Sequence, residues 1–397
     1  MHSMDDILRP ILDDIKQKEL DWKVYKLESN SGARGIVNGK EVLMFGTNNY
    51  LGLSNHPKLK EAAIEAVKKY GAGSGSVRAI AGTMDLHLNL EKTIAKFKHT
   101  EDAIYFQTGF AANAGSIPAI LTDKDLVISD ELNHGSIIDG VRITKAERGI
   151  YKHNNMEDLA NILDKAVKEN KYRMIYIITD GVFSMDGDIA PLDQIVKLKE
   201  QYDNVFIHVD DAHGDGVLGD HGRGIVNHFK VEGKVEAEMG TFSKAFGVVG
   251  GLLACSSTMK EYLHNKARTY LLSGSAPPAT VASCTAALEL LEEDDTFVKK
   301  LWENTNYFKS KVQKLGFDTG NTGTPIIPLM IGDSPKAKQF SKKLFEKGIF
   351  ALPIVFPMVA QGKARIRTQV RADFSKEDLD FALETIENVG QELNIIK

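Results

Sequence analysis

Short apolar runs and amphipathic stretches alternate along most of the chain. The apolar runs have the length and composition of buried strands, and most are separated by stretches whose apolar residues follow helical spacing. The runs are Ala103–Phe106, Leu126–Ser129, Met174–Thr179, Val205–Val209 and Gly250–Ala254. This order of strands and helices predicts an α/β fold.

The apolar runs also indicate how their strands are arranged. Residues 174–178 contain no polar alternation, which is typical of strands covered by helices on both faces. We therefore expect a mostly parallel sheet that binds its ligand at the carboxyl ends of the strands. Ahead of the first run, apolar spacing predicts a helix from Pro57 to Tyr70 that ends at Gly71.

The two ends of the chain differ from its middle. Residues 1–45 are charged and partly helical, and we expect an N-terminal arm there, followed by a large domain at 46–290. Residues 291–397 begin with a long charged helix and continue with strand, helix, strand and helix, which predicts a smaller α+β domain. The last helix starts at Ser375, and Asp378 stands at the spacing of a capping box.

Composition and charge exclude several classes of function. The 397 residues are 43% hydrophobic and 26% charged, as in ordinary globular proteins. The net charge of −5 and the lack of a basic stripe argue against a nucleic-acid partner. Cys255 and Cys284 stand far apart, so neither a disulfide framework nor a bound metal is expected. No apolar stretch is long enough for a membrane span, and we expect a cytoplasmic protein without a membrane partner.

Lys244 is the first candidate for chemistry. Within residues 237–258 only Glu238 and Lys244 carry charge, so we expect this lysine to be enclosed by glycine and apolar residues. Burial favours the neutral amine, which condenses with carbonyl compounds, and the nearby hydroxyls of Thr241 and Ser243 could bind a phosphate. The alternative is a lysine whose amine reaches solvent from the end of the sheet.

The segment Phe206–His213 places two carboxylates and an imidazole at the end of a buried strand. A carboxylate beside a pyridine nitrogen keeps that nitrogen protonated and makes the ring an electron sink, and an imidazole can donate to a phenolic oxygen. Asp210 and His213 suit these two functions, and Asp211 suits a structural hydrogen bond. A metal site made from the three side chains is the alternative, although no second cluster of ligands accompanies it.

Two other segments follow strand ends. Thr108, Gly109 and Phe110 stand between a strand and a helix, where backbone N–H groups could hold a phosphate, although such a glycine often has only a steric reason. His134 could stack on a flat ring, or it could cap the helix that follows.

Arg365 and Arg367 alternate with an apolar residue on one strand, so both point to the same face. One of them could bind a carboxylate bidentately, and pairing with an acidic side chain is equally plausible. Nucleotide-binding alternatives lack their motifs. Gly71–Ser76 has serine where the dinucleotide fingerprint needs its third glycine, and no P-loop sequence occurs.

Taken together, five motifs resemble those of the α-oxoamine synthases, pyridoxal 5'-phosphate (PLP) enzymes of fold type I that condense an amino acid with an acyl-CoA thioester. In chain order they are Asn48-Asn-Tyr-Leu-Gly52, Leu132-Asn-His-Gly-Ser136, Asp180-Gly-Val-Phe-Ser-Met-Asp186, Val209-Asp-Asp-Ala-His213 and Thr241-Phe-Ser-Lys244. The resemblance covers nearly the whole chain. It implies a large PLP-binding domain with a mostly parallel seven-stranded sheet, a smaller C-terminal domain, and a homodimer.

The resemblance also implies roles for the candidate residues. Lys244 would bind PLP covalently, give it up to the substrate amino acid and then remove a proton from the α carbon. Asp210 would pair with the ring nitrogen, and His213 and Ser184 would reach the phenolic oxygen. His134 would stack over the ring. Lys244, His134, Asp210 and His213 are thus the expected catalytic residues.

The remaining assignments complete the expected site. The cofactor-binding shell would include Thr108, Gly109, Phe110 and Thr241. Ser273 would reach the phosphate from the neighbouring subunit, although Leu272 stands where some members of the family have phenylalanine. Asn48 and Arg367 match positions that bind the amino acid substrate near its amino group and its carboxylate.

Several segments bear on the branch of the family. Ser76–Thr83, Asp180–Gly187 and Ala364–Gln369 are more similar to the glycine C-acetyltransferase pattern (2-amino-3-ketobutyrate CoA ligase). The first expectation is therefore condensation of glycine with acetyl-CoA to 2-amino-3-oxobutanoate and CoA. The continuation Asp188–Leu192 resembles the 8-amino-7-oxononanoate synthases of the biotin pathway, which use alanine and pimeloyl-CoA. That activity is the alternative.

Further alternatives stay open at this point. They are serine palmitoyltransferase, another fold type I reaction that needs no CoA, and a non-catalytic PLP-fold binding protein. By position, Ser76–Thr83 and Ile354–Val359 are the candidates for selecting the acyl chain.

Overall fold

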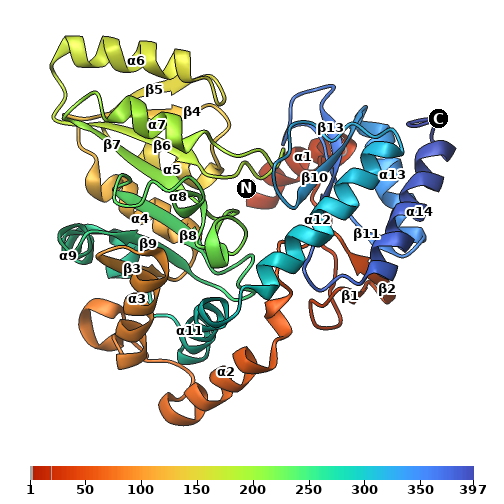
Figure 1. Cartoon of the computed structure of the whole chain (residues 1–397), viewed down its shortest axis with the longest axis horizontal. Coiled ribbons are helices and arrows are strands. Elements are labelled where there is room, and N and C mark those ends of the chain that lie inside the picture. Colours follow the sequence, from red (N-terminus) through yellow and green to blue (C-terminus); the bar gives the residue numbers. More distant parts are fainter. Residues whose placement is uncertain (1–2, 19) are drawn as a thin grey trace.

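A seven-stranded sheet forms the core of the larger part of the molecule, on the left in Figure 1. The computed structural model describes residues 3–18 and 20–397. In the order of the sheet, the strands are β3 (Asp102–Phe106), β9 (Gly251–Cys255), β8 (Ala237–Thr241), β7 (Val205–Asp210), β6 (Ile175–Asp180), β4 (Leu126–Asp130) and β5 (Glu147–Tyr151). Strands β4 to β8 are parallel, and β9 is antiparallel to both its neighbours. The mostly parallel sheet expected from the sequence is confirmed.

Helices cover both faces of this sheet, as the lack of polar alternation predicts. Within β6, Ile177 belongs to one hydrophobic core, whereas Tyr176 and Ile178 belong to another on the opposite face. The helices of this part are α2 (Pro57–Tyr70), α3 (Asp85–Lys98), α4 (Gly109–Ile120), α5 (Gly135–Ile143), α6 (Met156–Glu169), α7 (Leu192–Lys199), α8 (Ile225–His228), α9 (Ser257–Lys266), α10 (Arg268–Leu272) and α11 (Pro278–Glu293). Short helical turns lie at Leu53–Asn55, Arg78–Gly82 and Asp220–Gly222.

Five of the seven strands were predicted from the sequence, whereas β5 and β8 were not. Strand β5 lies at the edge of the sheet, and four of its five residues are not buried, so it lacks an apolar run. Strand β8 is fully buried but contains Glu238, a charged residue that breaks the hydrophobic pattern. Pairing with neighbouring strands, rather than the composition of each segment, therefore determines that β5 and β8 are extended.

The C-terminal elements form a smaller unit beside the large sheet, coloured blue in Figure 1. Strands β10 (Ile326–Gly332), β13 (Ala364–Gln369) and β12 (Leu352–Ile354) make an antiparallel sheet, packed with α12 (Thr296–Lys314), α13 (Ser334–Glu346) and α14 (Lys376–Glu392). Ser375 caps α14 through the predicted capping box with Asp378. The expected small C-terminal domain is confirmed.

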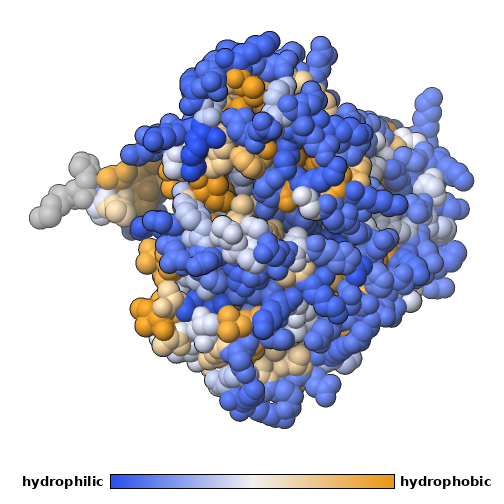
Figure 2. Space-filling view, turned by 60° about the vertical axis from the view of Figure 1, so that its left-hand side comes forward, coloured by the Kyte–Doolittle hydropathy of each residue, from blue (hydrophilic) through white to orange (hydrophobic). Residues whose placement is uncertain are grey.

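The N-terminal segment reaches this smaller unit. Strands β1 (Arg34–Val37) and β2 (Lys40–Met44) form a sheet with β11 (Ile349–Phe350). Helix α1 (Met4–Gln17) buries no residue and exposes apolar side chains such as Ile7 and Ile11. Hydrophobic residues are also exposed elsewhere on the face shown in Figure 2.

The domain boundaries near 45 and 290 remain predictions. In the part of the chain described, no helix is both long and apolar enough to cross a bilayer.

A buried ammonium fixes the strands that carry the candidate site. Lys98, at the end of α3, has its Nζ 2.8 Å from Asp215 Oδ1, 3.4 Å from Glu238 Oε2 and 3.6 Å from Asp211 Oδ2. It also donates to the carbonyl oxygen of Arg223 at 2.6 Å. Burial raises the pKa of Glu238 to about 7 and the pKa values of Asp211 and Asp215 above their usual range, although Lys98 opposes each shift. The ammonium of Lys98 is therefore shared by three buried acids and offsets part of their negative charge.

We predict that Lys98→Met lowers the free energy of unfolding by about 3–5 kcal/mol, the usual effect of removing one partner of a buried ion pair. Asp215 would then lose the ammonium that lies 2.8 Å from its Oδ1. Urea unfolding of the apoprotein measures the effect. The control is Lys68→Met, which removes an exposed pair with Glu65 and should cause a much smaller change. Equal effects of the two substitutions would contradict the assignment.

Candidate active site

A cavity of about 220 Å³ opens at the carboxyl ends of the parallel strands. Nine of the ten expected cofactor-binding residues line it: Thr108, Gly109, Phe110, His134, Ser184, Asp210, His213, Thr241 and Lys244. Several other residues line it without a role predicted from the sequence, namely Ser136, Asp180, Val182, Ala212 and Met239. Residues from five different strand ends thus meet at one place, as a doubly wound sheet requires.

Lys244 lines this cavity from the turn between β8 and β9. Its carbonyl oxygen accepts from the N–H of Gly247, where the backbone adopts a φ of 70°. Burial lowers the pKa of the Lys244 amine to about 8, although the carboxylates of Asp210 and Asp180 act in the opposite direction. A substantial fraction of the amine is therefore neutral near pH 8, which suits a group that must react with a carbonyl.

Asp210 ends β7, and both its carboxylate oxygens accept hydrogen bonds. Oδ2 accepts from Asn113 Nδ2 at 2.7 Å, and Oδ1 accepts from the N–H of Ala212 at 3.1 Å. Asn113 comes from α4 and is fully buried, with its Oδ1 3.2 Å from Nε2 of His208. These bonds hold the carboxylate toward the cavity. A polar residue inside the apolar helix α4 was the one sequence signal that could have identified Asn113.

The Asp210 carboxylate is linked to His134 through two side chains. Asn113 Nδ2 also donates to Ser136 Oγ at 3.0 Å, and Ser136 Oγ lies 2.8 Å from Nδ1 of His134. The N–H of Ser136 donates to the same Nδ1 at 3.2 Å. Nδ1 is therefore the acceptor, and the ring proton of the neutral imidazole is on Nε2.

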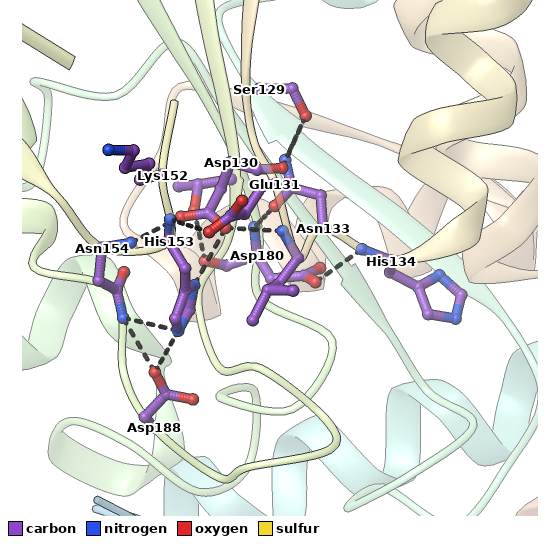
Figure 3. A network of polar contacts seen from close by, with 12 residues as sticks. Ser129, Asp130, Glu131, Asn133, His134, Lys152, His153, Asn154, Asp180 and Asp188 are labelled. Atoms are coloured by element: carbon purple, nitrogen blue, oxygen red, sulfur yellow. Dashed lines mark hydrogen bonds and ion pairs between the residues drawn. The ribbon is translucent and has the colours of Figure 1, made fainter. Parts of the chain in front are cut away.

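His134 caps α5 with Nδ1 and keeps its ring available to the cavity. Loss of hydration lowers the pKa of the imidazole, Asp210 opposes this effect, and Lys244 adds to it. The backbone N–H of His134 donates to Asp180 Oδ2 at 2.8 Å, and the ring points away from that contact (Figure 3). The sequence offered helix capping and ring stacking as alternatives for His134. The two are compatible, because Nδ1 caps α5 while the ring lines the cavity.

His213 is buried and bonded to a tyrosine from a distant segment. Its Nδ1 lies 2.9 Å from the hydroxyl of Tyr50. Burial raises the pKa of Tyr50 to about 12, with the Arg367 guanidinium acting in the opposite direction on the same oxygen. The bond to Tyr50 uses Nδ1, so Nε2 is the ring nitrogen of His213 that remains for a ligand in the cavity. Burial, followed by the charges of Lys244 and Arg367, lowers the pKa of His213 well below its usual range.

The two arginines of β13 have different surroundings. Arg365 donates to the carbonyl oxygen of Met185 at 3.1 Å and pairs with the Asp186 carboxylate. Arg367 donates from Nε to the carbonyl oxygen of Ser184 at 2.5 Å and from Nη1 to Asn48 Oδ1 at 3.1 Å, whereas its buried Nη2 has no hydrogen-bond partner. The structural pairing therefore applies to Arg365. The free donor of Arg367 suits an anionic ligand.

The start of α4 provides a place for a phosphate. Thr108 caps this helix by accepting from the N–H of Ala111, so the N–H groups of Gly109 and Phe110 face the cavity rim without partners inside the helix. The hydroxyl of Thr241 donates to Gly250 instead. Ser273 does not line the cavity within one chain. Its expected place in a neighbouring subunit stays a prediction.

Comparison with known proteins agrees with this geometry. Residues 40–386 match the family model described as aminotransferase class I and II. An 8-amino-7-oxononanoate synthase of Thermoanaerobacter pseudethanolicus is 52% identical over 391 residues, 98% of either chain. The 8-amino-7-oxononanoate synthase 1 of Bacillus subtilis is 50% identical over 98% of this chain and 99% of its own. A structure of serine palmitoyltransferase with a PLP internal aldimine superposes with a TM-score of 0.94, at 28% identity and full coverage of both chains.

The chain belongs to the aminotransferase class I and II family, the PLP-dependent enzymes of fold type I. Within that family it is an α-oxoamine synthase, an acyltransferase whose cofactor is PLP and whose substrates are an amino acid and an acyl-CoA. The resemblance seen in the motifs is thereby confirmed. The first expectation for the branch, glycine C-acetyltransferase, is not supported, because the relatives named above are 8-amino-7-oxononanoate synthases.

We predict that Asp210→Asn moves the pKa of Lys244 in the apoprotein further below about 8. The substitution removes a negative charge that stabilises the ammonium form. The pH dependence of labelling with an amine-reactive reagent, followed by peptide mapping, measures this pKa. Exposed Lys68, far from Asp210, serves as an internal control. An upward shift at Lys244 would show that Asp210 does not act on the amine.

Proposed function

We propose that this enzyme condenses alanine with pimeloyl-CoA to give 8-amino-7-oxononanoate, carbon dioxide and CoA. The observation that carries the proposal is the identity of 52% and 50%, over nearly full length, to proteins of that name. The cavity supports the same class of reaction, because Lys244 and Asp210 line it, and Arg367, which is bonded to the lining residue Ser184, has a free donor. Glycine C-acetyltransferase is the second candidate, favoured by three segments of the sequence.

PLP bound in the cavity would supply an electron sink for negative charge at the α carbon of the amino acid. Lys244 would hold the cofactor through its amine. Asp210, fixed by Asn113 and Ala212, would keep a negative charge beside the ring nitrogen. With the Tyr50 hydroxyl donating to Nδ1, the Nε2–H of His213 would donate to the phenolic oxygen. The start of α4 would bind the phosphate.

The same residues would direct the reaction of the substrate. The Nη2 of Arg367 and the side chain of Asn48 would hold the amino acid carboxylate and so orient the α carbon. Lys244, with its lowered pKa, would remove the α proton as a general base. The Nε2–H of His134 lies free to donate to the acyl oxygen as negative charge develops there. The roles of Arg367 and His134 each follow from hydrogen bonds that leave one donor free.

We predict that Arg367→Lys raises the KM for alanine about tenfold or more, because a hydrogen bond to a charged group contributes about 1.5–3 kcal/mol. A lysine cannot reproduce the paired N–H geometry of the guanidinium. Steady-state kinetics at saturating pimeloyl-CoA measures the change. The matched control is Arg365→Lys, two residues along the same strand, whose donors are already used by Asp186 and Met185. An equal rise of KM in both variants would contradict the carboxylate role.

We predict that free thiol is released from pimeloyl-CoA with alanine at a kcat/KM at least about tenfold above that from acetyl-CoA with glycine, equivalent to about 1.4 kcal/mol. A matrix of acetyl-, pimeloyl-, succinyl- and palmitoyl-CoA with alanine, glycine and serine covers the other branches. Omitting the amino acid gives the control for simple hydrolysis. The reverse order for acetyl-CoA and glycine would replace the proposal by the second candidate.

A further inference from the structure

His153 lies outside the cavity, between two carboxylates that belong to different loops (Figure 3). Its Nδ1 is 3.0 Å from Asp130 Oδ1, and its Nε2 is 2.7 Å from Asp188 Oδ2. The ring also stands edge-on to Phe183, with the centroids 4.3 Å apart and the planes at 85°. Carboxylates facing both ring nitrogens require a proton on each, so His153 is an imidazolium cation.

The carboxylate of Asp130 organises the loop that ends in His134. Besides His153, it accepts from the N–H of Leu132 at 2.9 Å and from the N–H of Asn154 at 2.9 Å. Next in this loop, Asn133 is bonded to the backbone of β6 on both sides, at Ile178 and Asp180. The start of α5, and with it the ring of His134, is thus fixed relative to β4 and β6.

The carboxylate of Asp188 acts on a second loop, the turn at residues 182–189 that carries Ser184. The carbonyl oxygen of Asp188 accepts from the N–H of Phe183 at 3.0 Å, and an isolated bridge joins Val182 to Ile189, so the turn is closed on itself. Asn154 Nδ2 donates to Asp188 Oδ2 at 2.9 Å, next to the bond from His153. The position of Ser184 therefore depends on where Asp188 is held.

The opposite side of this turn faces β13. Arg367 donates to the carbonyl oxygen of Ser184, and Arg365 donates to that of Met185. The turn is consequently held on one side by cations from the C-terminal unit and on the other by His153 alone among the described cationic side chains. Loss of His153 would leave it attached to the large sheet through Asn154 and its own backbone.

We propose that His153 is a positioning residue of the cofactor site: its cation joins Asp130 to Asp188 and so fixes the loop of His134 against the turn of Ser184. The proposal rests on the proposed roles of His134 and Ser184 but not on the identity of the acyl donor. Although burial acts in the other direction, the hydrogen bonds that His153 donates to Asp130 and Asp188 raise its pKa to about 10, so the cation persists throughout the neutral range. Glu131, which accepts from the N–H of His153, adds a further negative charge nearby, and Lys152 adds a positive one.

The test is His153→Gln in the PLP-loaded enzyme. Glutamine retains a donor for one carboxylate but cannot donate to both as a cation. We expect the visible circular dichroism per bound cofactor, which reports the orientation of the ring in its chiral site, to fall at least about twofold. We also expect kcat to fall about tenfold, as when a supporting residue behind a ligand is removed, while the KM for the acyl donor stays within about twofold.

The matched control is His228→Gln. His228 also stands edge-on to a phenylalanine, with the His228 and Phe229 centroids 4.9 Å apart and the planes at 83°. Among the described residues, its ring makes no hydrogen bond or ion pair with a carboxylate. Its replacement should leave the visible dichroism and kcat unchanged. If His153→Gln lowers the thermal midpoint yet leaves the dichroism per bound cofactor and kcat unaltered, His153 is merely structural and the proposal fails.

A second variant covers the case in which His153→Gln does not fold. Asp188→Asn keeps an oxygen that accepts from Nε2 but removes the charge, and it should give a smaller loss of dichroism in the same direction. An unchanged spectrum in this variant, with the fold intact, would also overturn the proposal. The dichroism requires no acyl-CoA, so an enzyme that proves to use another acyl donor would still give the expected spectra.

Discussion

The buried ammonium of Lys98 is the interaction on which the cofactor site depends most. Asp210 and Asp211 are neighbours in the chain, yet Asp210 faces the cavity while Asp211 faces Lys98. Asp215 and Glu238 complete the buried cluster from the following turn and from β8. Lys98 thereby offsets the acids behind the segment that presents Asp210 and His213. Without that cation, those acids would stay protonated or leave the interior.

Close packing around the same cluster explains two glycines that no active-site role requires. A Cβ at Gly240 would lie 1.7 Å from Asp215 Oδ2, and a Cβ at Gly224 would lie 1.9 Å from Asp211 Oδ2. At Gly224 the backbone also has a φ of 100°, which other residues rarely adopt. The acids can approach Lys98 only because these positions lack side chains. The ion pairs of Lys98 behind the site therefore depend on glycine at both positions, because a side chain there would displace the acids.

The sequence predicted most of the fold and most of the cavity, for identifiable physical reasons. Asp210 ends β7, and His134 and Ser184 follow β4 and β6, so the parallel order of these strands brings the three residues together. Lys244 was recognisable from the lack of other charge around it, although β8 before it was missed. Asn113 escaped notice because its role depends on packing against Asp210, 97 positions away in the chain. No local pattern records such a contact.

Tyr50 and the choice of branch show two other limits of sequence patterns. Tyr50 belongs to the motif at residues 48–52, but its bond to His213 spans 163 positions and appears only in the folded chain. The segments that favoured glycine C-acetyltransferase include the Ser184 turn and β13, which hold the cofactor and the amino acid carboxylate in the site proposed here. Residues with those tasks serve every branch alike, so similarity among them carries little information about the acyl chain.

The turn at residues 182–189 connects the two units of the molecule. It is the place where the large sheet, through His153, and the C-terminal unit, through Arg365 and Arg367, contact one short segment of chain. On the proposed roles, Ser184 reaches the cofactor from this turn, while Arg367 binds both the turn and the carboxylate of the substrate. Any shift of the C-terminal unit would then move the substrate and the cofactor contacts together, because the same guanidinium is bonded to both. The relative placement of the two units is consequently part of the active site itself.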